Sequence, residues 1–293
     1  MIVGAGFSGL IAAHVFPSMP ICDAAPEPKQ GHQALLRFRS DAVAKLTGID
    51  FKAVDVHKGI YFRGSFHEPN IQLANLYSRK VIDSIADRSV WDISTRRRYI
   101  APENFHEQLL DAVGSRITWG LVYNYDEAPL TISTAPLPNV LAALQIHTGV
   151  TWSRSPITVR KFRIPDSDVY QTIYFPSTQH SLYRASITGD VLIAEHVGHV
   201  YGEWMAEMLA AFGLDHELEW MGDTEQSYGK IAEVDNDLRK SAIHRLSSEH
   251  NIFSVGRFAT WKNILLDDVV DDAWKVKRLI NASRYDRQLG AIK

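Results

Sequence analysis

The segment MIVGAGFSGLIAAHVF, residues 1–16, decides the fold of this chain. Gly4, Gly6 and Gly9 form the pattern G-x-G-x-x-G directly after a short apolar run, and apolar residues continue behind it at helical spacing. This order predicts a strand, a tight turn and a helix, the arrangement that binds dinucleotides. A secretory signal is disfavoured, because the segment has no basic start, no Ala-x-Ala-like cleavage site and three interrupting glycines.

The residues that follow complete a β-α-β unit. Pro17 and Pro20 end the predicted helix, and a second strand is expected at 21–22 with Asp23 at its end. Asp23 comes 19 residues after Gly4, close to the ~20 expected between a phosphate loop and the acid that binds a ribose. A glycine turn that serves only packing would not explain an acid at that distance.

Each part of this unit has a physical task. Gly4 permits the tight turn, Gly6 lets a pyrophosphate approach the backbone, and Gly9 lets the helix pack on the strand. The helix N-terminus offers free N–H groups and a positive dipole end to phosphate. Asp23 can accept hydrogen bonds from ribose hydroxyls.

Three patches resemble flavoproteins of the glutathione-reductase-like FAD superfamily, nearest to its UDP-galactopyranose mutase and amine-oxidase branches. They are VGAGFSG at 3–9, LTISTAPLP at 130–138 and FSVGRFATWKNILLDDVV at 253–270. The resemblance implies FAD as cofactor and an α/β chain with a Rossmann-like FAD-binding domain. Its smaller α+β substrate domain carries an antiparallel sheet, as the β-rich segments between 151 and 196 also indicate.

The resemblance also implies cofactor contacts, residue by residue. Gly256 and Arg257 would lie by the pyrophosphate, Trp261 would replace the first tyrosine of the mutase motif, and Asp267 would contact the ribityl chain. A helix starting near Asp268 would point its N-terminus at the flavin N1/O2 region. The other implied contacts are Phe7, Ser8, Ala24, Gly31, Arg39, Val122, Thr134 and Val269.

Three residues are the candidate catalytic groups. His32 follows Gly31, which relatives place at the flavin edge, and would transfer a proton near N5. Tyr183 and Arg184 lie in the predicted antiparallel sheet, where Arg184 can bind a substrate carboxylate or phosphate with two hydrogen bonds. The alternatives are a structural histidine and a strand arginine that faces solvent.

The pattern of elements predicts a discontinuous domain organisation. We expect helices at 40–46, 71–90, 102–113 and 202–212, and a strand at 117–123. The FAD-binding domain is predicted to comprise 1–40, 97–145 and 225–293, and the substrate domain 41–96 and 146–224.

Positive charge concentrates between residues 79 and 98, where aromatic residues are interleaved. Arg96, Arg97 and Arg98 are candidate contacts to a substrate phosphate. A nucleic acid is an alternative partner, because basic and aromatic residues together can follow a phosphate backbone and stack bases. The simpler alternative is a solvated charged face.

Composition excludes several other classes of protein. With 31 basic and 34 acidic residues the net charge is −3, which disfavours a uniformly cationic nucleic-acid or membrane-surface binder. Cys22 is the only cysteine, so internal disulfides and Cys-x-x-Cys redox pairs are impossible. No apolar run approaches the roughly 18 residues of a membrane span, and no histidine spacing indicates a metal. We expect a cytoplasmic protein that binds no metal and no membrane.

These features predict an FAD-dependent oxidoreductase. We expect it to oxidise a C–N bond (of an amine or amino acid) or a C–O bond in a small or nucleotide-linked substrate, a modified base in DNA included, with oxygen as acceptor. A separate pyridine-nucleotide domain is not expected, since the chain has no second G-x-G-x-x-G. The alternatives are a redox-neutral sugar-nucleotide mutase and a flavin-binding protein without catalysis.

Overall fold

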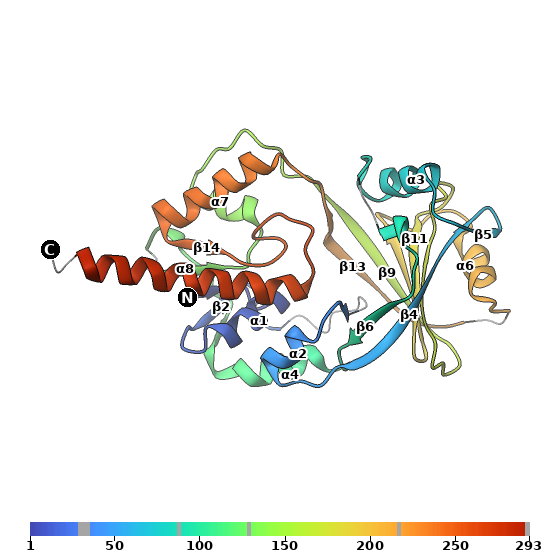
Figure 1. The fold of residues 1–293 in the computed structure, drawn as a ribbon, viewed down its shortest axis with the longest axis horizontal. Helices are drawn as coiled ribbons and strands as arrows, with labels where there is room; N and C mark the ends of the chain where they lie inside the picture. The colour runs from blue at the N-terminus through green and yellow to red at the C-terminus, as the bar shows by residue number, and fades with distance from the viewer. Residues whose placement is uncertain (29–35, 87–88, 128–129, 216–217, 291–293) are drawn as a thin grey trace.

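The chain forms two lobes side by side, as the computed structural model in Figure 1 shows. The structure describes residues 1–28, 36–86, 89–127, 130–215 and 218–290, and the side chains of Ser89, Glu127 and 283–290 are not described. Each lobe is built around its own β-sheet, and the C-terminal helix runs along the first lobe and points away from the second.

The first lobe contains a parallel sheet of five short strands. Its order is β14-β8-β1-β2-β7, and every neighbouring pair is parallel. The strands are β1 (Ile2–Val3), β2 (Ile21–Asp23), β7 (Ile117–Trp119), β8 (Thr131–Ser133) and β14 (Ile252–Ser254). The chain adds strands first on one side of β1 and then on the other, and ligands bind at the carboxyl ends of strands where such a reversal occurs. The predicted Rossmann-like domain is confirmed.

Helix α1 (Phe7–Val15) is the centre of the first lobe. Six of its nine residues are buried, so it must be covered on several sides. It packs against α8 (Leu266–Gly290), α2 (Ala42–Thr47) and α4 (Phe105–Val113). Helices α5 (Leu137–Ala143) and α7 (Asn236–His250) form a neighbouring apolar core with β14.

The second lobe contains a nine-stranded sheet of order β13-β9-β12-β11-β10-β4-β6-β3, with β5 paired to β4. Its pairs are antiparallel except β4 with β10. The strands are β3 (Arg37–Phe38), β4 (Lys52–Phe62), β5 (Ser65–His67), β6 (Arg96–Ile100), β9 (Arg154–Arg163), β10 (Tyr170–Tyr174), β11 (Leu182–Thr188), β12 (Val191–Val197) and β13 (Glu219–Ile231). The predicted antiparallel sheet is therefore present, with one parallel pair inside it.

The two faces of this sheet have different cover. Helix α6 (Trp204–Phe212) packs on the outer face, away from the first lobe. Helix α3 (Ile71–Ile82) covers part of the inner face, which carries Ile60, Tyr174 and Tyr183. The rest of the inner face is turned toward the first lobe (Figure 1).

Several predicted elements end earlier or begin later than expected. Helix α3 ends at Ile82 rather than at 90, because Asp83 adopts the left-handed conformation and caps it through the Arg79 carbonyl. Strand β7 ends at Trp119 rather than at 123, where Gly120 turns the chain with a positive φ. The helices predicted at 40–46 and 102–113 begin at Ala42 and Phe105.

The predicted domain boundaries at 96/97 and 224/225 fall within β6 and β13, so each boundary would divide one strand between two domains. In the described part of the chain, no helix is both long enough and apolar enough to cross a membrane.

Candidate functional site

The three glycines of the loop between β1 and α1 differ in what surrounds them. Gly4 has φ +99°, and a Cβ atom there would lie 2.4 Å from Thr134 Oγ1. A Cβ atom on Gly9 would lie 1.8 Å from the Gly4 carbonyl oxygen. By contrast, a Cβ atom on Gly6 would meet no atom within 4 Å, and Gly6 is exposed. The protein itself therefore requires glycine at 4 and 9, whereas the absence of a side chain at 6 leaves space outside the protein.

The N-terminus of α1 is available for an anion. Gly6 is its N-cap residue, and no side chain caps it. Uncapped N–H groups and the positive end of the helix dipole together attract phosphate. This helix end lies at the carboxyl edge of the parallel sheet, directly after its central strand.

Asp23 and Thr134 hold the loop from its two sides. Asp23 Oδ2 accepts a hydrogen bond from the Ala5 N–H at 2.7 Å, and Oδ1 accepts one from Ala25 N–H at 2.8 Å. Thr134 Oγ1 donates to the Val3 carbonyl at 2.9 Å. Asp23 therefore lies at the end of β2 beside the loop, as predicted from the spacing, and the adjacent Ala24 is exposed.

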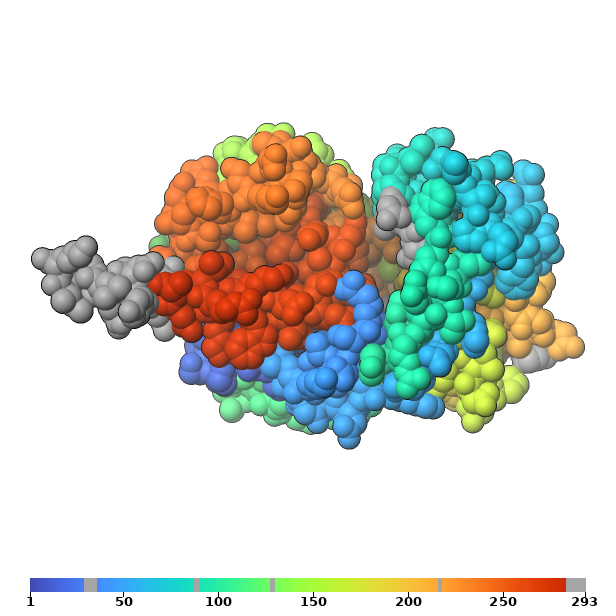
Figure 2. Space-filling view, in the orientation of Figure 1, coloured from blue at the N-terminus to red at the C-terminus, as the bar shows by residue number. Residues whose placement is uncertain are grey.

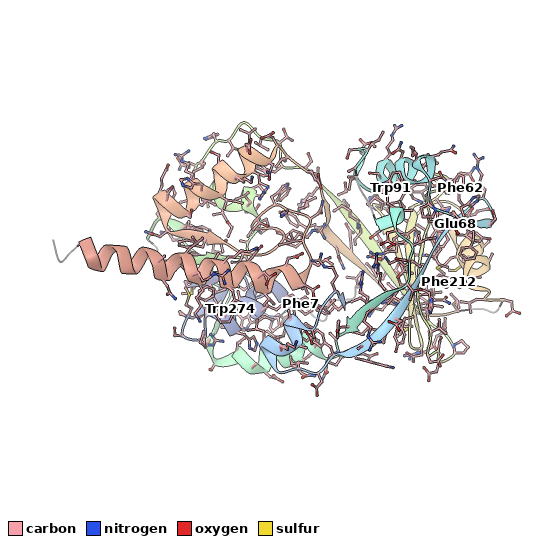
Figure 3. All side chains as sticks on the ribbon, viewed as in Figure 1. Phe7, Phe62, Glu68, Trp91, Phe212 and Trp274 are labelled. Atoms are coloured by element: carbon pink, nitrogen blue, oxygen red, sulfur yellow. The ribbon has the colours of Figure 1, made fainter. Side chains whose placement is uncertain are left out.

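The C-terminal motif meets the loop at Gly256. This residue has φ +93°, and a Cβ atom on it would lie 2.5 Å from Ser8 Oγ. Phe7, labelled in Figure 3, stacks on Phe105 with ring centroids 5.6 Å apart and so anchors the first turn of α1. The loop and the motif, from opposite ends of the chain, thus form one surface.

Asp267 and Asp268 at the start of α8 bind the segment before α2. Asp267 is 8% exposed and accepts hydrogen bonds from the Arg39 N–H, the Ser40 N–H and the Ser40 hydroxyl, at 2.9–3.0 Å. Asp268 accepts one from Arg39 Nη2 at 2.6 Å. Val269 is buried in the core of the lobe. Four predicted cofactor residues are thus brought together, and their contact with a cofactor stays a prediction.

Arg257 and Trp261 connect the motif to the second lobe. Arg257 Nη2 donates to the Gly229 carbonyl of β13 at 3.2 Å. Trp261 is 2% exposed, packs edge-on against Trp152, and donates from Nε1 to the Ala232 carbonyl at 3.1 Å. Their side chains are thus used in protein contacts, and their predicted cofactor contacts are untested.

The remaining predicted contacts are distributed differently. Gly31 and His32 lie outside the described residues. Val122 lies beyond the end of β7 and is 80% exposed, close to Leu121, whose N–H bonds to the Asp23 carbonyl.

Burial raises the pKa of Cys22 to about 11, and the negative charge of Asp23 adds to this shift, so the thiol is not a nucleophile at neutral pH.

Tyr183 and Arg184 converge on Glu195 at the inner face of the second sheet. Glu195 is 2% exposed and accepts hydrogen bonds from Arg184 Nη2 at 2.7 Å, Arg184 Nε and the Tyr183 hydroxyl at 3.0 Å. Burial opposes ionisation of Glu195, but the charge and hydrogen bonds of Arg184 outweigh it, so the pKa is lowered. Tyr183 is fully buried, whereas a third of the Arg184 side chain is exposed.

Arg37 also lies in this region, although the sequence contains no reason to expect its contacts with the second sheet. It reaches from β3 across the inner face, where Nη1 donates to Thr172 Oγ1 at 2.7 Å and Nη2 to Thr188 Oγ1 at 2.8 Å. Burial and the charge of Arg184 lower its pKa to about 9. Only the folded sheet brings these partners together, so no local signal could have identified Thr172 and Thr188 as partners of Arg37.

The three consecutive arginines of β6 do not act as one cluster. Successive side chains of a strand point to opposite faces, so Arg96 and Arg98 share a face and Arg97 lies on the other. Arg96 pairs with Asp92, and Arg97 lies 3.6 Å from Asp55. Within the described residues, no group of His, Cys, Asp and Glu side chains is arranged to hold a metal.

No protein-family model matches the chain. No curated protein matches it either.

Solved structures, however, show the fold across nearly the whole chain. A CLA-producing fatty acid isomerase from P. acnes superimposes with a TM-score of 0.60 at 10% identity, covering 94% of this chain and 97% of that one. An oxidoreductase from Methanosarcina mazei gives 0.57 at 10% identity, covering 94% and 99%. A protein assigned as an FAD-containing monooxygenase from Photorhabdus luminescens gives 0.53 at 9%, covering 97% and 88%.

The chain therefore shares its Rossmann-type fold with these three proteins, one of which is assigned as an FAD-containing monooxygenase, and the likeness does not single out the mutase or amine-oxidase branch.

Proposed function

We propose that this chain binds FAD at the loop between β1 and α1 and is an FAD-dependent oxidoreductase. One observation carries the proposal: the Cβ direction of Gly6 is open, at an uncapped helix N-terminus on the carboxyl edge of the parallel sheet. A cradle without a side chain fits a pyrophosphate that approaches the backbone closely. The fold shared with a protein assigned as an FAD-containing monooxygenase supports FAD as the dinucleotide.

The residues around this loop fit the other parts of FAD. Asp23 would bind the adenosine ribose, and its contact with the Ala5 N–H in the glycine-rich loop supports this role. Gly256 packs directly against Ser8 in the first turn of α1, and the N-terminus of α8 at Asp267 and Asp268 would hold the end nearer the flavin. FAD, when bound, supplies a hydride acceptor, and the protein supplies binding, orientation and electrostatics.

We propose that the substrate lies between the flavin and the inner face of the second sheet. Arg184, held by Glu195 and Tyr183, would orient it with the exposed third of its side chain. The substrate would lose a hydride from carbon and a proton from the attached nitrogen or oxygen, so that a C–N or C–O single bond becomes a double bond. Oxygen would take up the two electrons and become hydrogen peroxide. Amine oxidation is the reaction we propose first.

Anaerobic flavin reduction tests this function. FAD-loaded protein would be mixed without oxygen with a panel of amines, amino acids, alcohols and nucleotide conjugates. We expect at least one compound to bleach the flavin and then to produce peroxide in air. Turnover only after prior reduction with dithionite, with no net electron consumption, would contradict the proposal and support the redox-neutral mutase.

A further inference from the structure

Three cations share the inner face of the second sheet at its β4–β6 end. In the register of these strands Arg98 is opposite Val54 and Arg96 is opposite Val56. Lys58 is two residues beyond Val56 on β4, so its side chain lies on the same face.

These cations repel one another. Burial lowers the pKa of Lys58, the charge of Asp92 raises it, and the charges of Arg98 and Arg96 lower it. Burial likewise lowers the pKa of Arg98, Tyr174 and Asp267 raise it, and Arg39 and Arg96 lower it. An anion bound beside these like charges would favour their charged forms.

The protein compensates this charge only in part, through Asp92. Asp92 pairs with Arg96, and its backbone carbonyl accepts a hydrogen bond from Lys58 Nζ at 3.2 Å. Among the residues that the structure describes, no carboxylate lies within ion-pair distance of Lys58 or Arg98. Arg98 Nη1 donates instead to the Arg97 carbonyl at 2.8 Å.

The position of Arg98 is between the lobes. Its neighbour Tyr99 pairs with Phe38 of β3 and packs against the core of the first lobe, whereas Arg98 itself is opposite Val54 in the second sheet. Figure 2 shows a hollow between the lobes, and the chain around β6, coloured teal, lines one side of it. The cations therefore border the space in which we place the substrate.

We propose that Arg98 and Lys58 bind an anionic group of the substrate, either a carboxylate or a phosphate. Calling the ligand a substrate rests on the proposed function. The anion site itself does not, because its residues are held by the strands β4 and β6. Arg98 offers planar paired donors and Lys58 a compact charge, and both form charge-assisted hydrogen bonds with oxyanions. Arg97, on the opposite face beside Asp55, has no part in the site.

Calorimetric titration of the flavin-free protein with sodium phosphate and with sodium acetate tests the site, at ionic strength held constant with sodium chloride. The variants are R98Q, K58Q and R97Q, the last a matched control on the same strand. We expect at least one anion to bind the unmodified protein and R97Q equally, and at least tenfold more weakly to R98Q or K58Q. The anion that binds distinguishes phosphate from carboxylate.

Two outcomes would overturn the site. One is that neither anion binds more tightly than chloride, and the other is that R97Q weakens binding as much as R98Q does. If R97Q and R98Q also weaken the binding of single-stranded DNA equally, the arginines instead form a diffuse surface that binds polyanions. Thermal unfolding of each variant verifies that it is folded. Because no flavin is used, failure of FAD binding and failure of this site are separate results.

Discussion

Gly256 approaches Ser8 so closely that a Cβ atom on the glycine would lie 2.5 Å from the serine hydroxyl oxygen. The C-terminal motif is thereby built directly against the first turn of α1. The parallel sheet makes this possible, because β14, which precedes Gly256, lies two strands from β1. The candidate cofactor site is therefore formed by the two ends of the chain together.

Replacing Gly256 by alanine should destabilise the first lobe. Its φ of +93° is unfavourable for alanine and the added methyl group would collide with Ser8, so we expect a loss of roughly 2–4 kcal/mol in the free energy of unfolding. Gly114→Ala is the control, since Gly114 has φ −48° and a Cβ atom there meets nothing within 4 Å. Urea unfolding measures both variants, and equal stability of the two would refute the close approach.

Asp267→Ala should loosen the start of α8 from the segment before α2. The carboxylate accepts three hydrogen bonds in a nearly buried position, so its removal should cost about 2–4 kcal/mol. Asp271→Ala, on the exposed side of the same helix, should change the stability by less than about 0.5 kcal/mol. Chemical unfolding of both variants checks this. A loss as large in D271A would show that charge near the helix start, rather than these bonds, is responsible.

Glu195 and Arg184 should show strong coupling in a double-mutant cycle. Removing Glu195 alone (E195M) leaves a largely enclosed guanidinium without its partner, at a cost of roughly 3 kcal/mol once the exposed third of Arg184 is considered. The double variant R184M/E195M should be less destabilised than the sum of the single variants by at least about 1 kcal/mol. Additive losses would mean that the two side chains do not interact.

His196 should make stability depend on pH. It is fully buried, its Nδ1 shares a hydrogen bond with Ser181 Oγ at 2.9 Å, and burial, together with the charges of Arg160 and other cations, lowers its pKa to about 3. The unfolded chain, with an ordinary pKa of 6.5, binds a proton between pH 6.5 and 3 that the folded chain does not. Stability from this group is complete above pH 6.5 and falls toward pH 3, by up to about 1.4 kcal/mol per pH unit.

Unfolding free energies of the unmodified protein and H196N across this range isolate the effect. H196N should have a shallower slope, whereas H244Q, at an exposed position of α7, should keep the original one. Identical slopes in all three proteins would show that His196 is not held neutral.

Local sequence signals predicted the parts of the fold in which each residue's neighbours are close in sequence. The glycine spacing and the apolar residues behind it predicted β1, α1 and β2, and β-rich segments between 151 and 196 predicted the antiparallel strands found there. Strand β6 was missed because three successive arginines have no period of two, and only pairing with β4 assigns Arg97 and Arg98 to opposite faces. Helix α7 carried a signal that was overlooked, since Asp235 caps it by accepting the N–H groups of Asp237 and Leu238.

The candidate site shows the same division. Asp23 was predicted from its distance to Gly4, because both belong to one β-α-β unit. The bonds from Asp267 to Arg39 and Ser40, and those from Arg37 to the second sheet, join residues that are distant in sequence. Such partners are determined by tertiary packing, and one sequence contains no local pattern for them.

The most direct test of the central claim is titration of the purified protein with FAD, followed by flavin fluorescence, for the unmodified chain and for G6A. We expect the unmodified protein to bind FAD. G6A should unfold with unchanged stability, because its methyl group meets no protein atom, and should bind FAD at least tenfold more weakly. Absence of FAD binding by the folded, unmodified protein, or unchanged binding by G6A, would contradict the account.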